Sequence, residues 1–263
     1  MALLETQRLT KAFGGLRAVH ELDLRVELGE IVGLIGPNGS GKTTVFNLLT
    51  GIYRSTAGRM TFLRPDGAGS ELAGLPSHAI TALGIARTFQ NQRLFNQMTV
   101  LENVLVGMHC RTRAGIAGVL LGAPAVRAEA RRSRERAEEL LGLFGDRLRP
   151  RVAEPAWTLS YANRRRLEIA RALATGPRLL LLDEPAAGMN PTETRELMRD
   201  IVRIRDRGVA ILLIEHDMGL VRGICERVVA LDHGTKIAEG PFETVRDTPA
   251  VLEAYLGRRG GRA

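Results

Sequence analysis

The distribution of apolar positions along the chain predicts strands of two kinds. Residues 31–35, 179–182 and 209–214 form short apolar runs, which are typical of strands buried on both faces of a sheet. Residues 3–30 instead alternate between apolar and polar positions, which predicts half-exposed antiparallel strands. Residues 227–239 predict a hairpin near the C-terminus.

Apolar residues recur at helical spacing in the segments between these strands. Two such segments, residues 99–108 and 126–144, lie in a stretch of about 96–163 that we expect to form an inserted helical lobe. Further helices are expected after Ser160 and after Asn190, because both are residue types that favour a helix N-cap. Together with the strands, these helices favour the α/β class.

The remaining segments complete the predicted organisation. Residues 51–84 are rich in Gly, Pro and Ser and predict a surface β-lobe with loops. The polar face of residues 126–144 is dense with Arg and Glu and is expected to face solvent. A short helix is expected near 252–256, followed by a loose tail at 257–263. The whole chain, 1–263, is expected to form one domain.

The strongest chemical signal is a glycine-rich loop after the first apolar run. Residues 36–43 read GPNGSGKT and fit the phosphate-loop pattern G-x-x-x-x-G-K-S/T at every fixed position. Glycines leave backbone N–H groups free to surround a polyphosphate, Lys42 can reach the β- and γ-phosphates, and the Thr43 hydroxyl can hold Mg²⁺. A nucleoside triphosphate and Mg²⁺ are therefore expected ligands. The predicted nucleotide contacts are Gly36, Pro37, Asn38, Gly39, Ser40, Gly41, Lys42, Thr43 and Thr44.

Acidic residues and a histidine follow the two later apolar runs. Asp183 and Glu184 come at the end of the run that begins at residue 179, where a parallel strand would deliver them beside the phosphate loop. Asp183 is expected in the Mg²⁺ shell, and Glu184 is expected to orient or deprotonate the attacking water. His216 follows the next run at the same sheet edge, which favours a γ-phosphate contact over a structural role.

Composition narrows the possible partners. The formal net charge of +8 fits an anionic neighbour, such as a membrane surface or nucleic acid, and it equally fits a solvated basic face. Aromatic residues make up 4% of the chain, which argues against an extended base-stacking platform. The N-terminal residues lack an apolar signal core, and the apolar segment 115–126 is too short to span a membrane.

Six motifs in this order resemble the ATP-binding cassette (ABC) family over essentially the whole chain. They are the Walker A loop at 36–44, the Q-loop glutamine Gln90, the signature segment at 159–163, Walker B at 179–183 with Glu184, the D-loop at 187–190 and the switch histidine His216. The resemblance implies a RecA-like P-loop core with an antiparallel β-lobe and an inserted helical lobe, and it implies hydrolysis of ATP with Mg²⁺. It also implies that Phe13 stacks on the adenine and that Gln90 contacts the metal and the reaction site. Ser160 and Ala162 are expected to contact the nucleotide of a partner chain.

Longer stretches are similar to one importer subgroup of this family. Residues 13–19, 44–51, 84–91, 98–107 and 184–194 resemble the larger ATPase subunit of importers for branched-chain amino acids, urea or short amides. This resemblance implies a peripheral protein on the cytoplasmic face of the inner (plasma) membrane. Its expected partners are two transmembrane permease subunits, a second ATPase subunit (a copy or a paralogue) in a head-to-tail dimer and, indirectly, a solute-binding protein. No contact with nucleic acid is expected.

The signature segment departs from the family pattern. It reads LSYAN where the family usually has LSGGQ, so Ala162 replaces a glycine and Asn163 replaces a glutamine, and the D-loop ends in Asn190 instead of aspartate. The alternative function is that of a soluble ABC ATPase acting on ribosomes or nucleic acid, where basic charge would meet phosphate. Such proteins usually carry two cassettes or a long coiled-coil insertion, and this sequence shows one cassette and no long heptad run.

Overall fold

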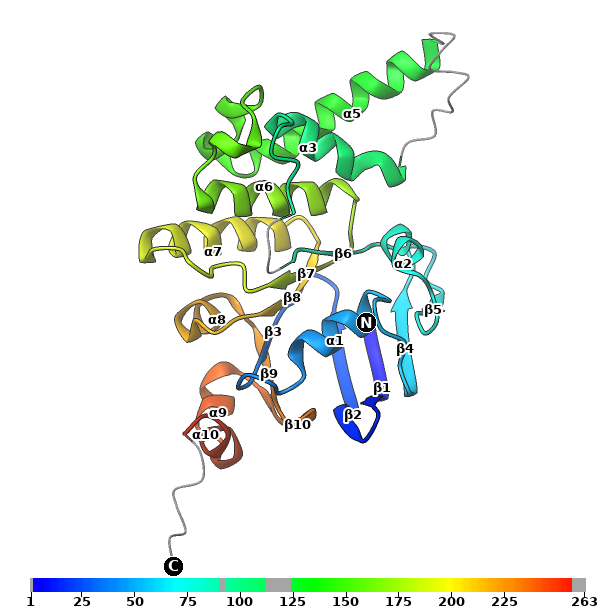
Figure 1. Cartoon of the computed structure of the whole chain (residues 1–263), viewed down its shortest axis with the longest axis vertical. Helices are drawn as coiled ribbons and strands as arrows, with labels where there is room; N and C mark the ends of the chain where they lie inside the picture. Colours follow the sequence, from blue (N-terminus) through cyan, green and yellow to red (C-terminus); the bar gives the residue numbers. More distant parts are fainter. Residues whose placement is uncertain (1, 90–92, 112–123, 257–263) are drawn as a thin grey trace, which may run out of the picture.

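Two β-sheets and their covering helices form the computed structural model, which describes residues 2–89, 93–111 and 124–256 (Figure 1). The strands are β1 (Ala2–Phe13), β2 (Leu16–Glu27), β3 (Ile31–Ile35), β4 (Ala57–Leu63), β5 (Gly69–Glu71), β6 (Ile85–Arg87), β7 (Leu179–Asp183), β8 (Ala210–Ile214), β9 (Arg227–Asp232) and β10 (Thr235–Gly240). The predicted site residue Gln90, the tail 257–263 and most of segment 115–126 lie outside the described residues.

Along the chain, most of the helices connect strands of the larger sheet. The α-helices are α1 (Lys42–Leu49), α2 (Ser77–Leu83), α3 (Val100–Gly107), α5 (Pro124–Gly142), α6 (Tyr161–Ala174), α7 (Pro191–Arg205), α8 (Met218–Ile224), α9 (Phe242–Arg246) and α10 (Pro249–Leu256). Short 3₁₀ turns are η1 (Met108–Arg111), η2 (Gly145–Arg147), η3 (Arg149–Arg151) and η4 (Ala156–Thr158).

The larger sheet has the strand order β10-β9-β3-β8-β7-β6. Strands β9, β3, β8, β7 and β6 are parallel, and β10 pairs antiparallel with β9 at one edge. Alternate residues of β7 enter different apolar clusters, with Leu180 and Leu182 in one and Leu179 and Leu181 in the other. Both faces of the sheet are therefore covered, which explains why its central strands appear in the sequence as continuous apolar runs.

The smaller sheet, β2-β1-β4-β5, is antiparallel and confirms the strands predicted over residues 3–30. Its apolar side shares one cluster with α1 and one face of the larger sheet. Within residues 51–84, expected to form strands and loops, the structure adds α2, which ends at Gly84 with a φ of 114°. Ile80 is the one buried residue of α2, so this helix has too little apolar periodicity to be recognised in the sequence.

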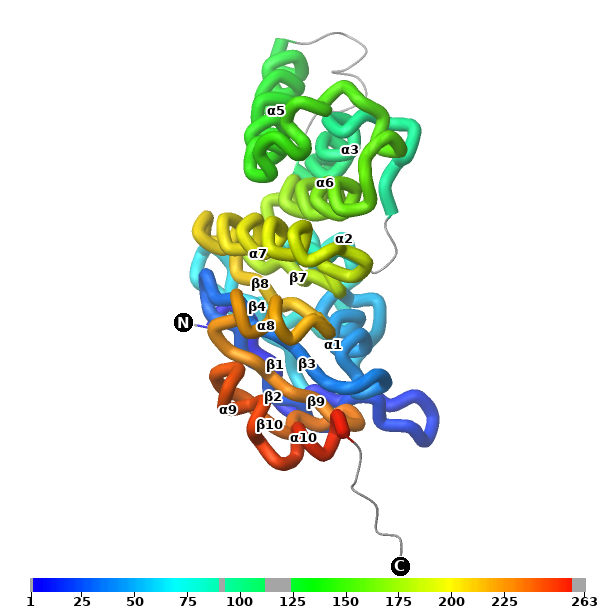
Figure 2. The backbone as a smooth tube through the Cα atoms, turned by 90° about the vertical axis from the view of Figure 1, so that its left-hand side faces the viewer, coloured from blue at the N-terminus to red at the C-terminus, as the bar shows by residue number. Residues whose placement is uncertain are grey.

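The helices α3, α5 and α6 lie between β6 and β7 in the chain and form one end of the molecule, opposite α9 and α10 (Figures 1 and 2). Within α5 the buried side chains are Ala137, Leu140 and Leu141, so its arginine-rich face is exposed as predicted. Among the residues that the structure describes, no helix has the length and apolar character needed to cross a membrane.

The carboxyl ends of β3, β7 and β8 lie next to one another. β8 pairs in parallel with both β3 and β7, so the chain leaves all three strands at the same edge of the sheet. The loop 36–41 follows β3, Glu184 follows β7, and His216 lies two residues after β8. The fold thus brings three segments far apart in sequence to one place.

Candidate functional site

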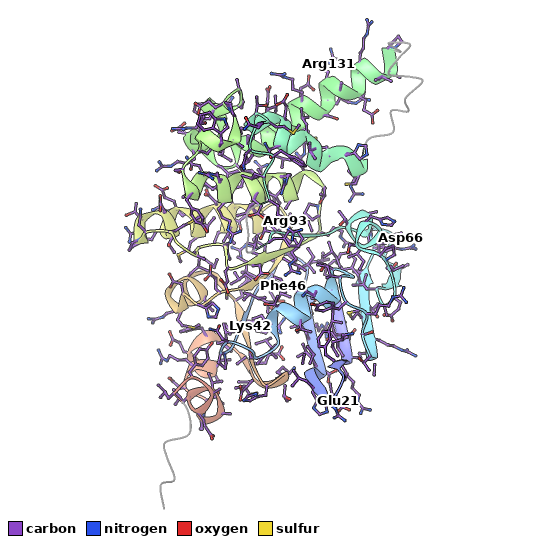
Figure 3. The ribbon with its side chains drawn as sticks, in the orientation of Figure 1. Glu21, Lys42, Phe46, Asp66, Arg93 and Arg131 are labelled. Atoms are coloured by element: carbon purple, nitrogen blue, oxygen red, sulfur yellow. The ribbon has the colours of Figure 1, made fainter. Side chains whose placement is uncertain are left out.

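A cavity of about 260 Å³ opens at this edge of the larger sheet. Residues 38–44 of the predicted phosphate loop line it, together with Glu184 and His216, whereas Gly36 and Pro37 lie outside the lining. The cavity is also lined by Leu16, Arg17, Ala18 and His233, which the sequence analysis did not identify. Figure 3 shows Lys42 at the start of α1, with Phe46 one turn further along that helix.

Two glycines of the loop occupy positions where a side chain would not fit. Gly36 has a φ of 150°, and a Cβ there would lie 2.2 Å from the carbonyl oxygen of Leu231. Gly41 has a φ of 100°, and a Cβ there would lie 2.4 Å from the carbonyl oxygen of Ala18. Both positions require glycine, because the backbone is left-handed and neighbouring backbone approaches closely.

Lys42 is the buried cation of the loop. Its Nζ donates hydrogen bonds to the carbonyl oxygens of Gly36, at 2.7 Å, and Pro37, at 2.9 Å. Burial lowers the pKa of Lys42, and the nearby carboxylates of Glu184 and Asp183 oppose this shift. The ammonium group therefore holds the loop in its curved shape and also places a positive charge beside the cavity.

Asp183, the predicted metal ligand, forms a buried ion pair with Arg87 of β6. Nη2 of Arg87 donates to Oδ2 of Asp183 at 2.7 Å, and Nη1 donates to Oδ1 of Asn47 at 2.6 Å. The rings of Phe46 and Phe89 lie 5.3 Å and 5.2 Å from Cζ of Arg87, within cation–π range. The orientation of Asp183 is therefore fixed from the neighbouring strand by Arg87, which the sequence analysis missed although it lies in the stretch 84–91 that resembles the importer subgroup.

Glu184 and His216 contact each other in the lining of the cavity. Oε1 of Glu184 lies 3.1 Å from Nε2 of His216. Glu184 has a φ of 47°, an uncommon left-handed conformation for a non-glycine residue, and its N–H donates to the carbonyl oxygen of Ile214 at 2.9 Å. The structure thus brings together the carboxylate and the histidine that the sequence placed at one sheet edge.

A buried glutamate, Glu215, organises the backbone around this pair. Its Oε1 accepts a hydrogen bond from the N–H of Ala186 at 2.7 Å, and its Oε2 accepts one from the N–H of His216 at 3.0 Å. Burial raises the pKa of Glu215, and these backbone hydrogen bonds oppose the shift. Glu215 therefore links the end of β8 to the segment that follows Glu184.

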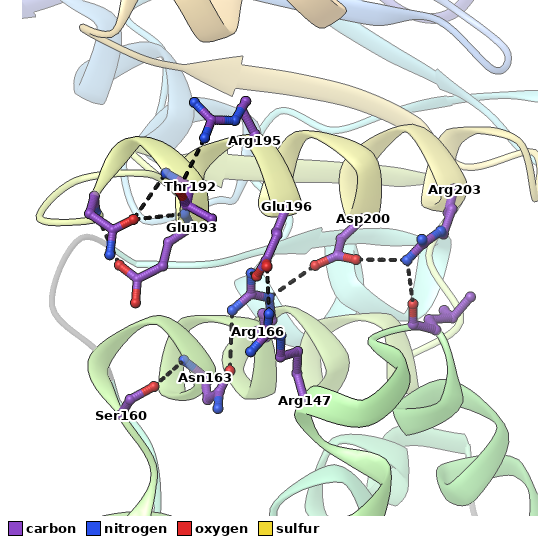
Figure 4. Close-up of polar contacts among 12 residues, drawn as sticks. Arg147, Ser160, Asn163, Arg166, Thr192, Glu193, Arg195, Glu196, Asp200 and Arg203 are labelled. Carbon is purple, nitrogen blue, oxygen red and sulfur yellow. Dashed lines mark hydrogen bonds and ion pairs between the residues drawn. The ribbon is translucent and has the colours of Figure 1, made fainter.

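The predicted signature residues lie at the start of α6 and do not line the cavity of their own chain (Figure 4). Ser160 is exposed and caps the helix, since its Oγ accepts a hydrogen bond from the N–H of Asn163 at 3.4 Å. Ala162 is only 3% exposed. Oδ1 of Asn163 accepts a hydrogen bond from Arg166, which also pairs with two carboxylates of α7. The signature segment is thereby joined to the helix that follows the D-loop.

Two aromatic residues outside the cavity lining are relevant to the site. Phe13 is exposed but lies outside the cavity lining. Its ring packs edge-on against Tyr53, with 5.2 Å between the ring centroids, and Nζ of Lys11 lies 4.8 Å from the centroid of the Phe13 ring. Its stacking on adenine therefore stays a prediction. Tyr255 of α10, which the sequence analysis did not identify, lines a second cavity together with Ile35 at the end of β3, and burial raises the pKa of its hydroxyl. The C-terminal helix thus lies beside the strand that leads into the phosphate loop.

This fold and this site define a P-loop ATPase. A phosphate loop after one parallel strand, with carboxylates after the strands beside it, is an arrangement suited to binding and hydrolysing a nucleoside triphosphate. The family model described as ABC transporter matches residues 19–187, and the model described as branched-chain amino acid ATP-binding cassette transporter matches residues 235–260. The chain belongs to the ABC transporter family and is an ATP-binding cassette that powers transport.

Relatives and solved structures agree with this assignment. The chain is 46% identical over 256 residues to the high-affinity branched-chain amino acid transport ATP-binding protein BraF of Pseudomonas aeruginosa, covering 97% of this chain and 98% of BraF. It is 36% identical over 256 residues to the lipopolysaccharide export system ATP-binding protein LptB of Acidithiobacillus ferridurans, covering 97% of each. The crystal structure of the ADP conformation of an ABC transporter cassette superposes with a TM-score of 0.83 at 28% identity, covering 98% of this chain and 99% of that one.

Proposed function

We propose that this chain hydrolyses ATP to power the uptake of branched-chain amino acids, or related small polar solutes, by an ABC importer. The observation that carries the proposal is the match of residues 235–260 to a branched-chain amino acid cassette, beyond the general ABC transporter match that ends at residue 187. Relatives named for branched-chain amino acid transport reach 46% identity, whereas the export-system relative LptB reaches 36%. The higher identity supports import over export.

In the proposed mechanism the phosphate loop holds ATP, and residues after β7 and β8 promote hydrolysis. Backbone N–H groups of the loop and the ammonium of Lys42 bind the phosphates. Glu184 accepts a proton from the attacking water, and His216, which lies 3.1 Å from it, contacts the γ-phosphate and orients the carboxylate. Phe13 stacks on the adenine from its exposed position at the end of β1.

Thr43 and Asp183 are the residues that would hold Mg²⁺. Thr43 lines the cavity, and Asp183 is held in place by Arg87; a hydroxyl and a carboxylate are the oxygen ligands that this ion prefers. Across residues 2–89, 93–111 and 124–256 no group of three or more His, Cys, Asp or Glu could hold a metal, so the nucleotide phosphates would supply further ligands. Gln90 is a further proposed contact, from the sequence alone. When bound, the ion neutralises charge on the phosphates.

The signature residues require a second chain in this proposal. Because Ser160 and Ala162 do not line the cavity of their own chain, we place them against the nucleotide of a partner cassette in a head-to-tail dimer. The partner is a copy of this chain or a paralogue. Each cavity would then be completed by the other chain.

A groove of about 410 Å³ beside β6 supports docking of the permeases. Phe95 and Val106 line it and expose 48% and 39% of their surface, so an apolar segment of a permease could cover them. The protein would then lie on the cytoplasmic face of the inner membrane, under two permease subunits that receive solute from a binding protein. In this setting the chain has no role that requires nucleic acid.

Uptake into proteoliposomes tests the proposal. Assembled with two permeases and the solute-binding protein, the chain should import labelled leucine only when Mg²⁺ and ATP are supplied. Glu184→Gln keeps the side-chain shape but removes the base, so it should bind ATP, stop turnover and remain dimeric in gel filtration. Glu135→Gln on the exposed face of α5 is the matched control. Wild-type turnover by Glu184→Gln would refute the mechanism, and ATPase activity stimulated by RNA without uptake would favour the alternative function.

A further inference from the structure

Arg165 of α6 connects two segments that border the proposed catalytic site. Its side chain is fully buried, and its Nη2 donates hydrogen bonds to the carbonyl oxygens of Asp183, at 3.2 Å, and Glu184, at 2.9 Å. Its Nη1 donates to the carbonyl oxygen of Phe89 at 2.6 Å. One guanidinium group therefore binds both the backbone at the end of β7 and the backbone that follows β6.

Glu168, one turn further along α6, completes the contact with Phe89. Its Oε2 accepts a hydrogen bond from Nη1 of Arg165 at 2.8 Å, and its Oε1 accepts one from the backbone N–H of Phe89 at 3.0 Å. A buried ion pair is weak evidence of a contribution to stability, because the cost of desolvating both charges offsets their attraction. The bonds from this pair to the backbone of two loops indicate a positioning role instead.

Glu184 occupies a conformation that depends on its surroundings. A left-handed conformation is unfavourable for a residue other than glycine, and Glu184 has a φ of 47°. Its N–H donates a hydrogen bond to the carbonyl oxygen of Ile214, and its carbonyl oxygen accepts one from Arg165. Because the side chain leaves from the Cα between these two groups, the two hydrogen bonds set the direction in which the carboxylate reaches His216.

We propose that Arg165 is a positioning residue for ATP hydrolysis, which fixes Glu184 in its left-handed conformation and transmits displacements of Phe89 to it. This inference rests on the proposed role of Glu184 as the catalytic carboxylate. Glu168 lines the groove assigned above to a permease segment, so an occupant of that groove lies next to the Arg165–Glu168 pair. A shift of the permease would move this pair and thereby change the placement of Glu184.

The geometry of the contact requires an arginine. The guanidinium group donates to three backbone carbonyl oxygens and to the Glu168 carboxylate. Both of its terminal nitrogens, Nη1 and Nη2, take part in these hydrogen bonds. A lysine carries the same charge but presents its three donors from one point, so it cannot bridge both segments. Arg165→Lys therefore separates the geometry of the contact from its charge, and Arg165→Gln removes both.

The experiment measures turnover, nucleotide affinity and local backbone protection for Arg165→Gln and Arg165→Lys. In the assembled transporter, both variants should lower kcat by about tenfold or more while KM for ATP stays within about twofold. The ratio of ATPase activity with solute-loaded binding protein to the activity without it should fall toward one. In the isolated full chain, amide hydrogen exchange should become faster in both 85–89 and 183–187.

Arg166→Gln is the matched control, because Arg166 is equally buried in α6 but bonds to Asn163, Glu196 and Asp200 (Figure 4). It should leave amide exchange in 85–89 unchanged. If Arg165→Gln does not fold, the comparison rests on Arg165→Lys. A folded Arg165 variant with wild-type kcat and exchange, while Glu184→Gln is inactive, would overturn this inference alone. Wild-type turnover by Glu184→Gln would instead overturn the proposed function.

Discussion

Nη2 of Arg87 lies 2.7 Å from Oδ2 of Asp183, and each of the two side chains is 6% exposed. The two residues are far apart in sequence but meet because β6 and β7 pair in parallel, with Arg87 opposite Leu181. A buried carboxylate is tolerated when it is paired and becomes costly when its partner is removed. The strand that leads into the Q-loop therefore supports the acidic end of Walker B.

Arg87→Met should destabilise the nucleotide-free protein. Removing one partner of a buried ion pair typically costs about 3–5 kcal/mol, because the remaining charge stays buried without compensation. Urea unfolding followed by circular dichroism measures the difference in unfolding free energy. The control is Arg131→Met, which removes an exposed partner of Glu135 and should cost less than about 1 kcal/mol. Equal unfolding midpoints for the two variants would contradict the importance of the buried pair.

Lys42→Ala should weaken ATP binding. The loss of a charge-assisted hydrogen bond to phosphate costs about 1.5–3 kcal/mol, which corresponds to a rise in Kd of roughly 10- to 150-fold. Titration of the isolated chain with a fluorescent ATP analogue measures this change. Lys236→Ala, which removes a lysine paired with Glu239 on β10, should leave Kd unchanged. An unaltered Kd in folded Lys42→Ala protein would contradict the assignment of the phosphate loop.

The sequence predicted those parts of the fold and site that depend on local patterns. The apolar runs located β3, β7 and β8, and the cap residue Asn190 correctly predicted the start of α7, where it forms a capping box with Glu193. The phosphate loop, Glu184 and His216 could be placed together because parallel strands end at one edge of a sheet. These features need no knowledge of contacts between side chains from distant segments.

The supporting contacts could not be predicted in this way. Arg165 and Glu168 are charged residues in a helix, and such residues usually face solvent, yet both are buried against distant backbone. Only the packing of α6 over β6 and β7 places them beside Phe89 and Asp183. The short helices α2 and α8 were missed because seven residues carry too little periodicity to distinguish a helix from a loop.

Glu215 should make the stability of the protein depend on pH. Burial raises its pKa in the folded state above the unfolded value of about 4.3. At pH values between these two pKa values, the folded state therefore binds more protons than the unfolded state. Stability attributable to Glu215 should therefore be highest at low pH and fall as pH rises through this window. The unfolding free energy of the wild type minus that of Glu215→Gln, measured by urea unfolding at a series of pH values, isolates this contribution.

The difference between the two proteins should decrease as pH rises and then stay constant above the folded pKa. Other carboxyl groups cancel in this comparison, because both proteins contain them. A wild-type advantage over Glu215→Gln that grows with pH would contradict the raised pKa.

Ala162→Gly restores the residue that the ABC signature usually has, and the structure predicts what this restoration changes. Ala162 is the second residue of α6 and is 3% exposed, so its methyl group packs inside its own chain. Glycine costs a helix about 1 kcal/mol relative to alanine, and unfolding in urea should show a loss of this size.

Because Ala162 does not line the cavity of its own chain, ATP affinity of the isolated chain should be unchanged. In the assembled transporter, kcat should stay within about twofold of the wild type, since the methyl group is buried in its own chain and Ala162 would contact the partner's nucleotide through its backbone. Ala170→Gly, at a fully buried position of the same helix, is the control for the loss of stability. A tenfold rise in kcat for Ala162→Gly alone would show that the methyl group crowds the partner's site.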